Sequence, residues 1–235
     1  MKLRFQITKD KDIRFISHLE YVRTLGRAIR RAKLPAAYSE GFNHHLKFSL
    51  ASALGVGVVS YTEFLEVELE EPMEIESAAQ ALSSALPRGI RVLSADAVDT
   101  HHAALMAQAA GAGYRVTLPL NKNIAGAVAD YNSRKTLLFK KAAPKLKEKF
   151  KEVDVKEYIP EIKVEETAAG LVFSFDCKIT PQGSMKAVDL LNALNEQYAL
   201  ELPVEKADIE RLRLFRLNKN GKKISMLNSD AIKFN

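Results

Sequence analysis

The order in which the sequence predicts strands and helices leaves few folds open to residues 1–100. Alternating apolar and polar residues predict strands over 3–8, 47–59, 61–69 and 90–98, and apolar residues at helical spacing predict helices over 18–33 and 74–86. Strand, helix, strand, strand, helix, strand is the order of a split βαβ sandwich of the ferredoxin-like type. We therefore expect an α+β domain with an antiparallel sheet and its helices on one face.

The same order of elements recurs in the second half of the chain. Strands are predicted over 114–120, 171–179 and 209–217, helices over 123–131 and 183–198, and further extended segments over 136–143 and 150–166. No residues repeat at a fixed period, so the duplication rests on element order alone. We predict two ferredoxin-like sandwiches in tandem: an N-terminal domain at 1–100, a linker at 101–113 and a C-terminal domain at 114–235.

The composition is that of a soluble, cytoplasmic protein. The 235 residues contain no apolar run near the roughly 18 residues that a membrane-spanning helix needs. Residues Met1–Phe5 alternate in polarity as a strand does, whereas a signal peptide has a continuous apolar stretch. Cys177 is the only cysteine, so no internal disulfide can form, and a reducing compartment is the simple interpretation.

Charge is distributed unevenly along the chain, although the total is only +6. Residues 1–50 contain 11 Lys and Arg against 4 Asp and Glu, residues 51–110 contain 2 against 9, and residues 111–235 contain 22 against 16. The net charges of the three segments are therefore +7, −7 and +6. Such a distribution predicts either a polarised surface that attracts a polyanion or segments that neutralise each other in the fold.

The helix predicted at 18–33 has a defined start and two distinct faces. Ser17 and Glu20 match a capping box, in which each side chain accepts a hydrogen bond from the other residue's backbone amide, and Pro35 prevents the helix from continuing. At 100° per residue the apolar face consists of Val22, Leu25, Gly26, Ile29 and Ala32. The opposite side carries Arg23, Arg27, Arg30 and Arg31, which we call the arginine stripe.

The arginine stripe places like charges three and four residues apart, and each such pair costs roughly 0.2–0.5 kcal/mol in an isolated helix. No acidic residue lies between Tyr21 and Ser39 to relieve this repulsion. Arginine at every position suits bidentate contacts with phosphate or carboxylate groups. We predict an anionic, RNA-like ligand. The alternatives are that the stripe packs on the acidic segment 61–76 of this chain, or on the carboxylates of a partner protein.

A loop at 38–47, with the sequence Tyr-Ser-Glu-Gly-Phe-Asn-His-His-Leu-Lys, follows the helix. Gly41 and Asn43 suit turn conformations with positive φ. Phe42 either stacks on a base or fills the core beneath the loop, and the sequence leaves both open. A lysine-rich segment at 134–151 adds further positive charge. The predicted ligand-binding residues are Arg14, Arg23, Arg27, Arg30, Arg31, Phe42, Asn43, His45 and Lys47.

The sequence contains no recognisable metal or cofactor motif. His44 and His45 are adjacent, so in an extended segment they point to opposite sides and do not share one metal, and His101-His102 is a weaker pair still. Gly55-Val56-Gly57 lacks the third glycine and the helix of a dinucleotide-binding fingerprint, and there is no P-loop. One cysteine cannot hold an iron–sulfur cluster by thiolates. We therefore predict no metal and no cofactor on this chain.

The residues of the helix and loop also resemble a known family. The resemblance is carried by Arg14-Phe15, Ser17-His18-Leu19, Arg23, Arg27-Ala28, Arg30-Arg31-Ala32, Leu34-Pro35, Tyr38-Ser39, Gly41-Phe42-Asn43, His45 and Lys47, and later by 153–159 and Gly183-Ser184. These residues are similar to the bacterial radical SAM-linked domain of unknown function, from which the chain departs at His44 and Leu46, where prolines are usual. The resemblance implies a radical SAM protein as partner. S-adenosylmethionine and the iron–sulfur cluster are then expected on that partner.

Three functions remain open at the level of sequence. The first is an accessory protein, not catalytic by itself, that binds an RNA-like anion through the arginine stripe and works with a radical SAM enzyme. The second is a metal-independent RNA-processing enzyme in which His18 and His45 act as acid and base. The third is a subunit that only binds another protein. The sequence does not give the substrate, the oligomeric state, or whether the two halves pack as one unit.

Overall fold

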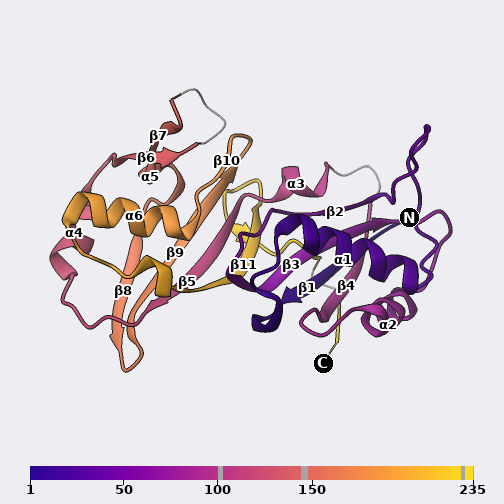
Figure 1. The fold of residues 1–235 in the computed structure, drawn as a ribbon. Helices are drawn as coiled ribbons and strands as arrows, with labels where there is room; N and C mark the ends of the chain where they lie inside the picture. Colours follow the sequence, from indigo (N-terminus) through magenta and orange to yellow (C-terminus); the bar gives the residue numbers. More distant parts are fainter. Residues whose placement is uncertain (100–102, 144–147, 229–230, 235) are drawn as a thin grey trace. The chain divides into compact units, whose positions relative to one another are not determined.

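The computed structural model describes residues 1–99, 103–143, 148–228 and 231–234 (Figure 1). It divides into two compact units. Unit 1 consists of Met1–Ala110 and Arg213–Asn235, and unit 2 consists of Gly111–Leu212. Helices and strands occur in both units, so the α+β class is confirmed. Within the described ranges, no helix is both long and apolar enough to cross a membrane.

Unit 1 is built on an antiparallel sheet. Its elements are β1 (Lys2–Lys9), η1 (Lys11–Ile13), α1 (His18–Arg31), β2 (Phe48–Leu50), β3 (Val58–Glu68), α2 (Ile75–Ala85), β4 (Val92–Val98), α3 (Leu105–Gln108), β12 (Lys223–Ile224) and β13 (Ile232–Lys233). β3 pairs with β2 and β1, β1 pairs with β4, and β4 pairs with β13. β3 therefore pairs with both β1 and β2, and β1 lies between β3 and β4.

The core of unit 1 forms where α1 and α2 cover the sheet. Leu3, Phe5 and Ile7 of β1 are fully buried, as are Leu25 and Ile29 of α1. These residues follow the period of two of a strand and the three-to-four spacing of a helix, which is why they meet on one side. The predicted apolar face of the helix is therefore confirmed at its centre, and the opposite side of α1 stays open to solvent.

The start of α1 is fixed by local hydrogen bonds. The Ser17 hydroxyl accepts from the backbone amide of Glu20 at 3.2 Å, as the predicted cap requires. The fully buried Lys9 donates through Nζ to the carbonyl oxygens of Arg14 and Ile16 at 2.9 and 3.0 Å. Tyr21 donates through its hydroxyl to the carbonyl of Thr8 at 2.8 Å. The helix is thereby held against the end of β1.

Unit 2 contains two hydrogen-bonded sheets. Its elements are β5 (Gly111–Leu118), α4 (Ala125–Ser133), β6 (Leu138–Ala142), β7 (Phe150–Asp154), α5 (Val155–Tyr158), β8 (Ile162–Thr167), β9 (Gly170–Thr180), β10 (Gly183–Ser184), α6 (Ala187–Tyr198) and η2 (Val204–Lys206). β9 pairs with β5, β8 and β10, and all these pairs are antiparallel. β6 and β7 form a separate two-stranded sheet. β11 (Asp208–Leu217) begins in unit 2 and ends in unit 1.

Several predicted boundaries differ from the structure. The predicted strand 47–59 is extended only at 48–50 before the chain turns, and Gly57, at φ +82°, precedes a single long strand β3. The segment 150–166 was predicted as extended but contains α5, because Asp154 caps a helical turn by accepting from the backbone amide of Lys156 at 3.0 Å. The helix predicted at 183 starts at Ala187, since Gly183-Ser184 turn back to pair with β9.

The compact units also differ from the predicted division into 1–100, 101–113 and 114–235. Residues 111–113 of the predicted linker belong to β5, and 105–108 form α3. Residues 213–235 belong to unit 1, because β13 pairs with β4 and the Arg4 guanidinium donates to the carbonyl of Met226. That the two halves of the chain are ferredoxin-like sandwiches stays a prediction.

A close backbone contact in unit 2 predicts the effect of one substitution. Gly170 has φ +112°, and a Cβ there would lie 2.1 Å from the carbonyl oxygen of Leu118. Gly170→Ala is therefore expected to lower the free energy of unfolding by roughly 3 kcal/mol, from backbone strain and the clash together. Gly183→Ala is the matched control, because Gly183 has a similar φ of +114° with nothing within 4 Å. Equal shifts of the urea midpoint for the two variants would contradict the prediction.

Candidate functional site

The arginine stripe lies on the exposed side of α1. Tyr21, Leu25 and Ile29 face the core, whereas all four arginines are exposed. Two of the arginines have partners: Arg23 donates to the Glu20 carboxylate at 2.6 Å, and Arg31 donates to the carbonyl of Ala85, at the end of α2, at 2.6 Å. The first contact neutralises the charge of Arg23. The second gives a hydrogen-bond donor to a backbone carbonyl at the C-terminal end of α2.

Arg27 and Arg30 are the two members of the stripe that remain available. Neither forms a hydrogen bond or an ion pair with any residue that the structure describes. Both are exposed, and they lie three residues apart on one side of α1. This pair of guanidinium groups is therefore free to meet an external anion.

The acidic segment 61–76 does not neutralise the stripe within the described residues. Glu63 accepts from the Ser60 hydroxyl at 2.5 Å, and Glu66 accepts from Arg4 at 2.8 Å. Glu68 lies 3.4 Å from the Nζ of Lys47, the predicted ligand-binding residue of the loop. Glu63, Glu66 and Glu68 therefore contact residues outside the arginine stripe. Among the described residues, no ion pair supports the alternative in which the stripe packs on this segment.

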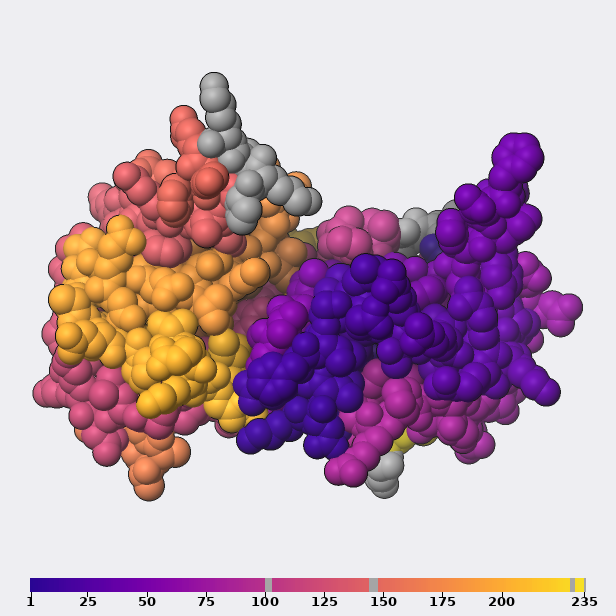
Figure 2. All heavy atoms as spheres, in the orientation of Figure 1, coloured from indigo at the N-terminus to yellow at the C-terminus, as the bar shows by residue number. Residues whose placement is uncertain are grey.

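Residues 36–47 form a hairpin that projects from unit 1 (Figure 2). Ala36 bridges to Leu69 and Tyr38 to Leu46, and Ser39 ties the two arms together. The Ser39 amide donates to the His45 carbonyl at 2.8 Å, and the Ser39 hydroxyl accepts from the His45 amide at 3.0 Å. The sequence did not single out Ser39, although a serine before a Gly-containing turn is a common signal of this role.

The tip of the hairpin is open to solvent. Phe42 has a relative exposure of 107 %, so of the two alternatives for this residue the structure excludes the one in which it fills the core. Gly41 has φ +107°, the positive value predicted for it, whereas Asn43 is not among the residues with positive φ. Asn43 and His45 are exposed beside Phe42. An aromatic ring without intramolecular packing is available for stacking.

The stripe and the hairpin meet at Phe48. A Cβ at Gly26 would lie 3.4 Å from the Phe48 ring and 3.9 Å from Nη1 of Arg30, so the ring and the guanidinium lie over the same point of α1. Phe48 directly follows Lys47 at the end of the hairpin. Arg30 is therefore close to the base of the hairpin, and the cations of α1 and the hairpin share one part of the surface.

Arg14 does not belong to this surface. Its side chain is buried, and Nε donates to the carbonyl of Gly57 at 2.8 Å. Gly57 precedes β3, whereas the hairpin joins the chain at Leu69 after the same strand. The 11 residues of β3 separate the two points by roughly 35 Å. Arg14 is a packing residue here.

His18 and His45 are not brought together. His18 is the first residue of α1, and the hairpin with His45 follows the other end of this helix. The 14 residues of α1 span about 21 Å. His45 makes its recorded hydrogen bonds through its backbone, to Ser39. The arrangement gives no acid–base pair of the kind predicted.

The rest of the described chain offers no cluster of three or more His, Cys, Asp and Glu side chains able to hold a metal ion. His101 and His102 lie outside the described residues. Burial raises the pKa of the Cys177 thiol to about 11, so the thiol is protonated at neutral pH and is a poor nucleophile.

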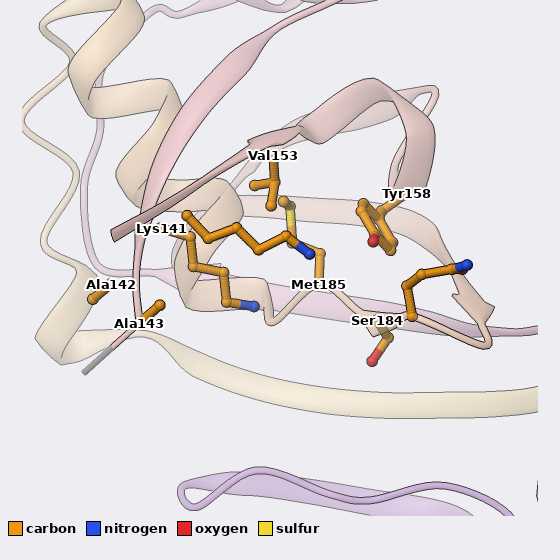
Figure 3. A pocket seen from close by; sticks show the side chains of 9 residues that line it. Lys141, Ala142, Ala143, Val153, Tyr158, Ser184 and Met185 are labelled. Atoms are coloured by element: carbon orange, nitrogen blue, oxygen red, sulfur yellow. The ribbon is translucent and has the colours of Figure 1, made fainter. Parts of the chain in front are cut away.

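Unit 2 contains a pocket that sequence reasoning did not single out. It has a volume of about 170 Å³ and lies between the β6–β7 hairpin and the turn from β9 to β10 (Figure 3). Its lining residues are Lys141, Ala142, Ala143, Lys151, Val153, Tyr158, Gln182, Ser184 and Met185. The sequence pointed to this region only by the high lysine content of 134–151. That content does not reveal which residues of β6 and β7 lie opposite each other.

Residues 2–207 match the sequence profile of the family described as "Uncharacterized protein conserved in bacteria (DUF2344)". The chain belongs to this family. The DUF2344 match includes α1, the hairpin and the pocket of unit 2. The search of curated proteins found no match.

Among solved structures, a chain of "Crystal Structure of a Cbf5-Nop10-Gar1 Complex" is similar to the DUF2344 chain. The TM-score is 0.48 and the sequence identity is 11 %, over 89 % of this chain and 49 % of that chain. The DUF2344 chain therefore spans about half the length of the chain that it matches. A similarity at this level carries no argument about function.

Proposed function

We propose that this protein is an accessory subunit that binds an RNA-like polyanion through unit 1 and works with a radical SAM enzyme. The observation that carries the proposal is the exposed pair Arg27 and Arg30, which have no partner within the described residues, with Arg30 close to the base of the 36–47 hairpin. Lys47 and the exposed ring of Phe42 extend the same surface.

Arginine is well suited to a phosphate backbone. Its planar guanidinium donates two parallel hydrogen bonds to phosphate oxygens and keeps its charge at every physiological pH. A like-charged pair on a helix costs free energy unless a ligand neutralises it. Arg23 differs, because Glu20 already neutralises it at 2.6 Å. The proposal therefore assigns the main phosphate contacts to Arg27 and Arg30.

The hairpin supports a nucleic-acid ligand over other anions. Unit 1 carries both a fully exposed aromatic ring and exposed cations, the two kinds of group by which proteins hold single-stranded nucleic acids, because the ring stacks on a base while the cations follow the backbone. Asn43 and His45 add hydrogen-bonding groups beside the ring.

The partner enzyme is proposed from the resemblance of 14–47 to the radical SAM-linked domain. This chain has one cysteine, and that cysteine is buried in unit 2. An iron–sulfur cluster bound by several thiolates, together with S-adenosylmethionine, would then belong to the partner. RNA cleavage by His18 and His45 is not supported, because the two residues lie at opposite ends of α1.

The proposal is tested by measuring the binding of a labelled single-stranded RNA by fluorescence anisotropy at several salt concentrations. The affinity is expected to fall with salt, with a slope of about −0.7 for each phosphate contacted. An affinity that does not change with salt, or the absence of RNA binding, would contradict it. Co-purification of a protein that resists nuclease but fails in high salt would then favour a protein interface.

Phe42→Ala is expected to weaken RNA binding by roughly 5–160-fold without lowering stability. One stacked base contributes about 1–3 kcal/mol, and the exposed ring contributes no packing to unit 1. The matched control is Phe15→Ala, because Phe15 is 75 % exposed and lies near Gly57 at the other end of β3. The two variants are compared by anisotropy and thermal unfolding, and equal losses of affinity would exclude stacking on Phe42.

A further inference from the structure

The pocket of unit 2 carries an unusual pair of like charges. Lys141 and Lys151 lie directly opposite each other in the β6–β7 register, and both line the pocket. Like charges in directly opposed positions destabilise a sheet. The neighbouring pair, Lys140 opposite Glu152, has complementary charges. The repulsion is therefore confined to the face of the hairpin that borders the pocket.

Only one of the two lysines is neutralised. Lys141 forms an ion pair with Asp189 of α6 at 2.8 Å. Lys151 is exposed and has no ion pair or hydrogen bond within the described ranges. The pocket consequently holds one ammonium group without an ion-pair partner among the described residues, and an anion between the strands would offset the repulsion.

Neutral donors surround this charge. Tyr158, Gln182 and Ser184 line the pocket, and their side chains form no hydrogen bonds with other described residues. Val153 and Met185 supply an apolar wall, and Figure 3 shows these two side chains and Tyr158 around the pocket. Cations and hydroxyl donors beside an apolar wall suit a phosphate group attached to an organic body.

The hollow next to the pocket has the opposite character. It shares Lys151, Val153, Tyr158 and Gln182 with the pocket, and it has a volume of about 360 Å³. Its other lining residues are Glu152, Asp154, Glu157 and Thr180. Carboxylates accept hydrogen bonds, so this side suits hydroxyl groups rather than a second phosphate.

We propose that unit 2 binds a phosphate monoester of a hydroxyl-bearing molecule, such as a nucleoside monophosphate, with the phosphate between Lys141, Lys151 and Ser184. The hydroxyl groups of the ligand face the carboxylates of the adjoining hollow. The phosphate belongs either to a free small molecule or to the 5′ end of an RNA chain. This site is independent of the arginine stripe and of the RNA binding proposed for unit 1.

The test is isothermal titration calorimetry of the full chain with adenosine 5′-monophosphate, adenosine and a 5′-phosphorylated oligoribonucleotide. The monophosphate is expected to bind and adenosine is not. Lys151→Met is expected to weaken binding of the monophosphate by about 10-fold or more, because a charged hydrogen bond is lost. Arg27→Glu/Arg30→Glu should leave it unchanged, which separates this site from that of unit 1.

Lys140→Met is the matched control, because Lys140 belongs to the same two-stranded sheet but lies opposite Glu152 rather than opposite a lysine. Lys151→Met should not lower the unfolding temperature, since it removes a repulsion, so a loss of binding would not reflect misfolding. Measured on Arg27→Glu/Arg30→Glu, in which the RNA site proposed for unit 1 is removed, tighter binding of the phosphorylated oligonucleotide than of the monophosphate identifies an RNA end as the source, and the reverse identifies a free small molecule. The proposal is overturned if no phosphate monoester binds, or if the two lysine variants lose affinity equally.

Discussion

Arg27→Glu/Arg30→Glu is expected to weaken the binding of single-stranded RNA by roughly 10–100-fold at moderate salt. Both side chains are exposed and have no partner among the described residues, so the substitution removes no recorded contact within unit 1. If each arginine contacts one phosphate, the slope of log K against log salt should become shallower by about 1.4. Anisotropy titrations at several salt concentrations measure both quantities.

The control for this variant is Arg88→Glu/Arg91→Glu, which changes the net charge equally. These exposed arginines pair with Asp12 and Asp10 at 2.7 and 3.0 Å, so they have partners within unit 1. Exposed pairs of this kind contribute little to stability. If the control variant loses as much RNA affinity as the α1 variant, binding depends on total charge and not on the arginine stripe.

Arg4→Met is expected to lower the free energy of unfolding by about 3–5 kcal/mol. Arg4 is buried, and it donates through Nε and Nη2 to Oε2 of Glu66 at 3.2 and 2.8 Å. Removing the guanidinium leaves the Glu66 carboxylate buried, with only Lys2 nearby at 3.9 Å. The bond from Arg4 to the carbonyl of Met226 is lost as well. Urea unfolding followed by circular dichroism gives the value.

The double variant Arg4→Met/Glu66→Met separates the effect of the unpaired Glu66 carboxylate from that of the lost bond to the carbonyl of Met226. Replacing a buried ion pair by apolar residues of similar size is often close to neutral, because neither charge is then left without a partner. We expect the double variant to recover most of the stability lost in Arg4→Met. A single variant within about 1 kcal/mol of the wild type would mean that water already reaches Glu66.

Local signals in the sequence were sufficient for α1. Ser17 and Glu20 gave the start of the helix, and the spacing of Leu25 and Ile29 gave the buried side, which in turn placed the arginine stripe in solvent. What the sequence did not give was the partner of each arginine. Arg31 reaches a carbonyl at the end of α2, a contact between residues 54 positions apart that no local pattern encodes.

The hairpin and unit 2 were harder to predict, because in both the exposure of a side chain depends on which residues pair across two strands. Whether Phe42 packs or projects depends on the bridge between Tyr38 and Leu46, which lifts the tip away from the core. The pocket depends on the register that sets Lys141 opposite Lys151. A change of register by one residue would place different side chains on that face, and composition does not reveal it.

The most direct test of the proposed function is to crosslink RNA to the protein with ultraviolet light in the native complex and to map the modified peptides by mass spectrometry. The account predicts adducts within residues 23–47, including Phe42, and their loss in Arg27→Glu/Arg30→Glu. Adducts confined to other parts of the chain, or a nuclease-resistant complex without any RNA adduct, would contradict it.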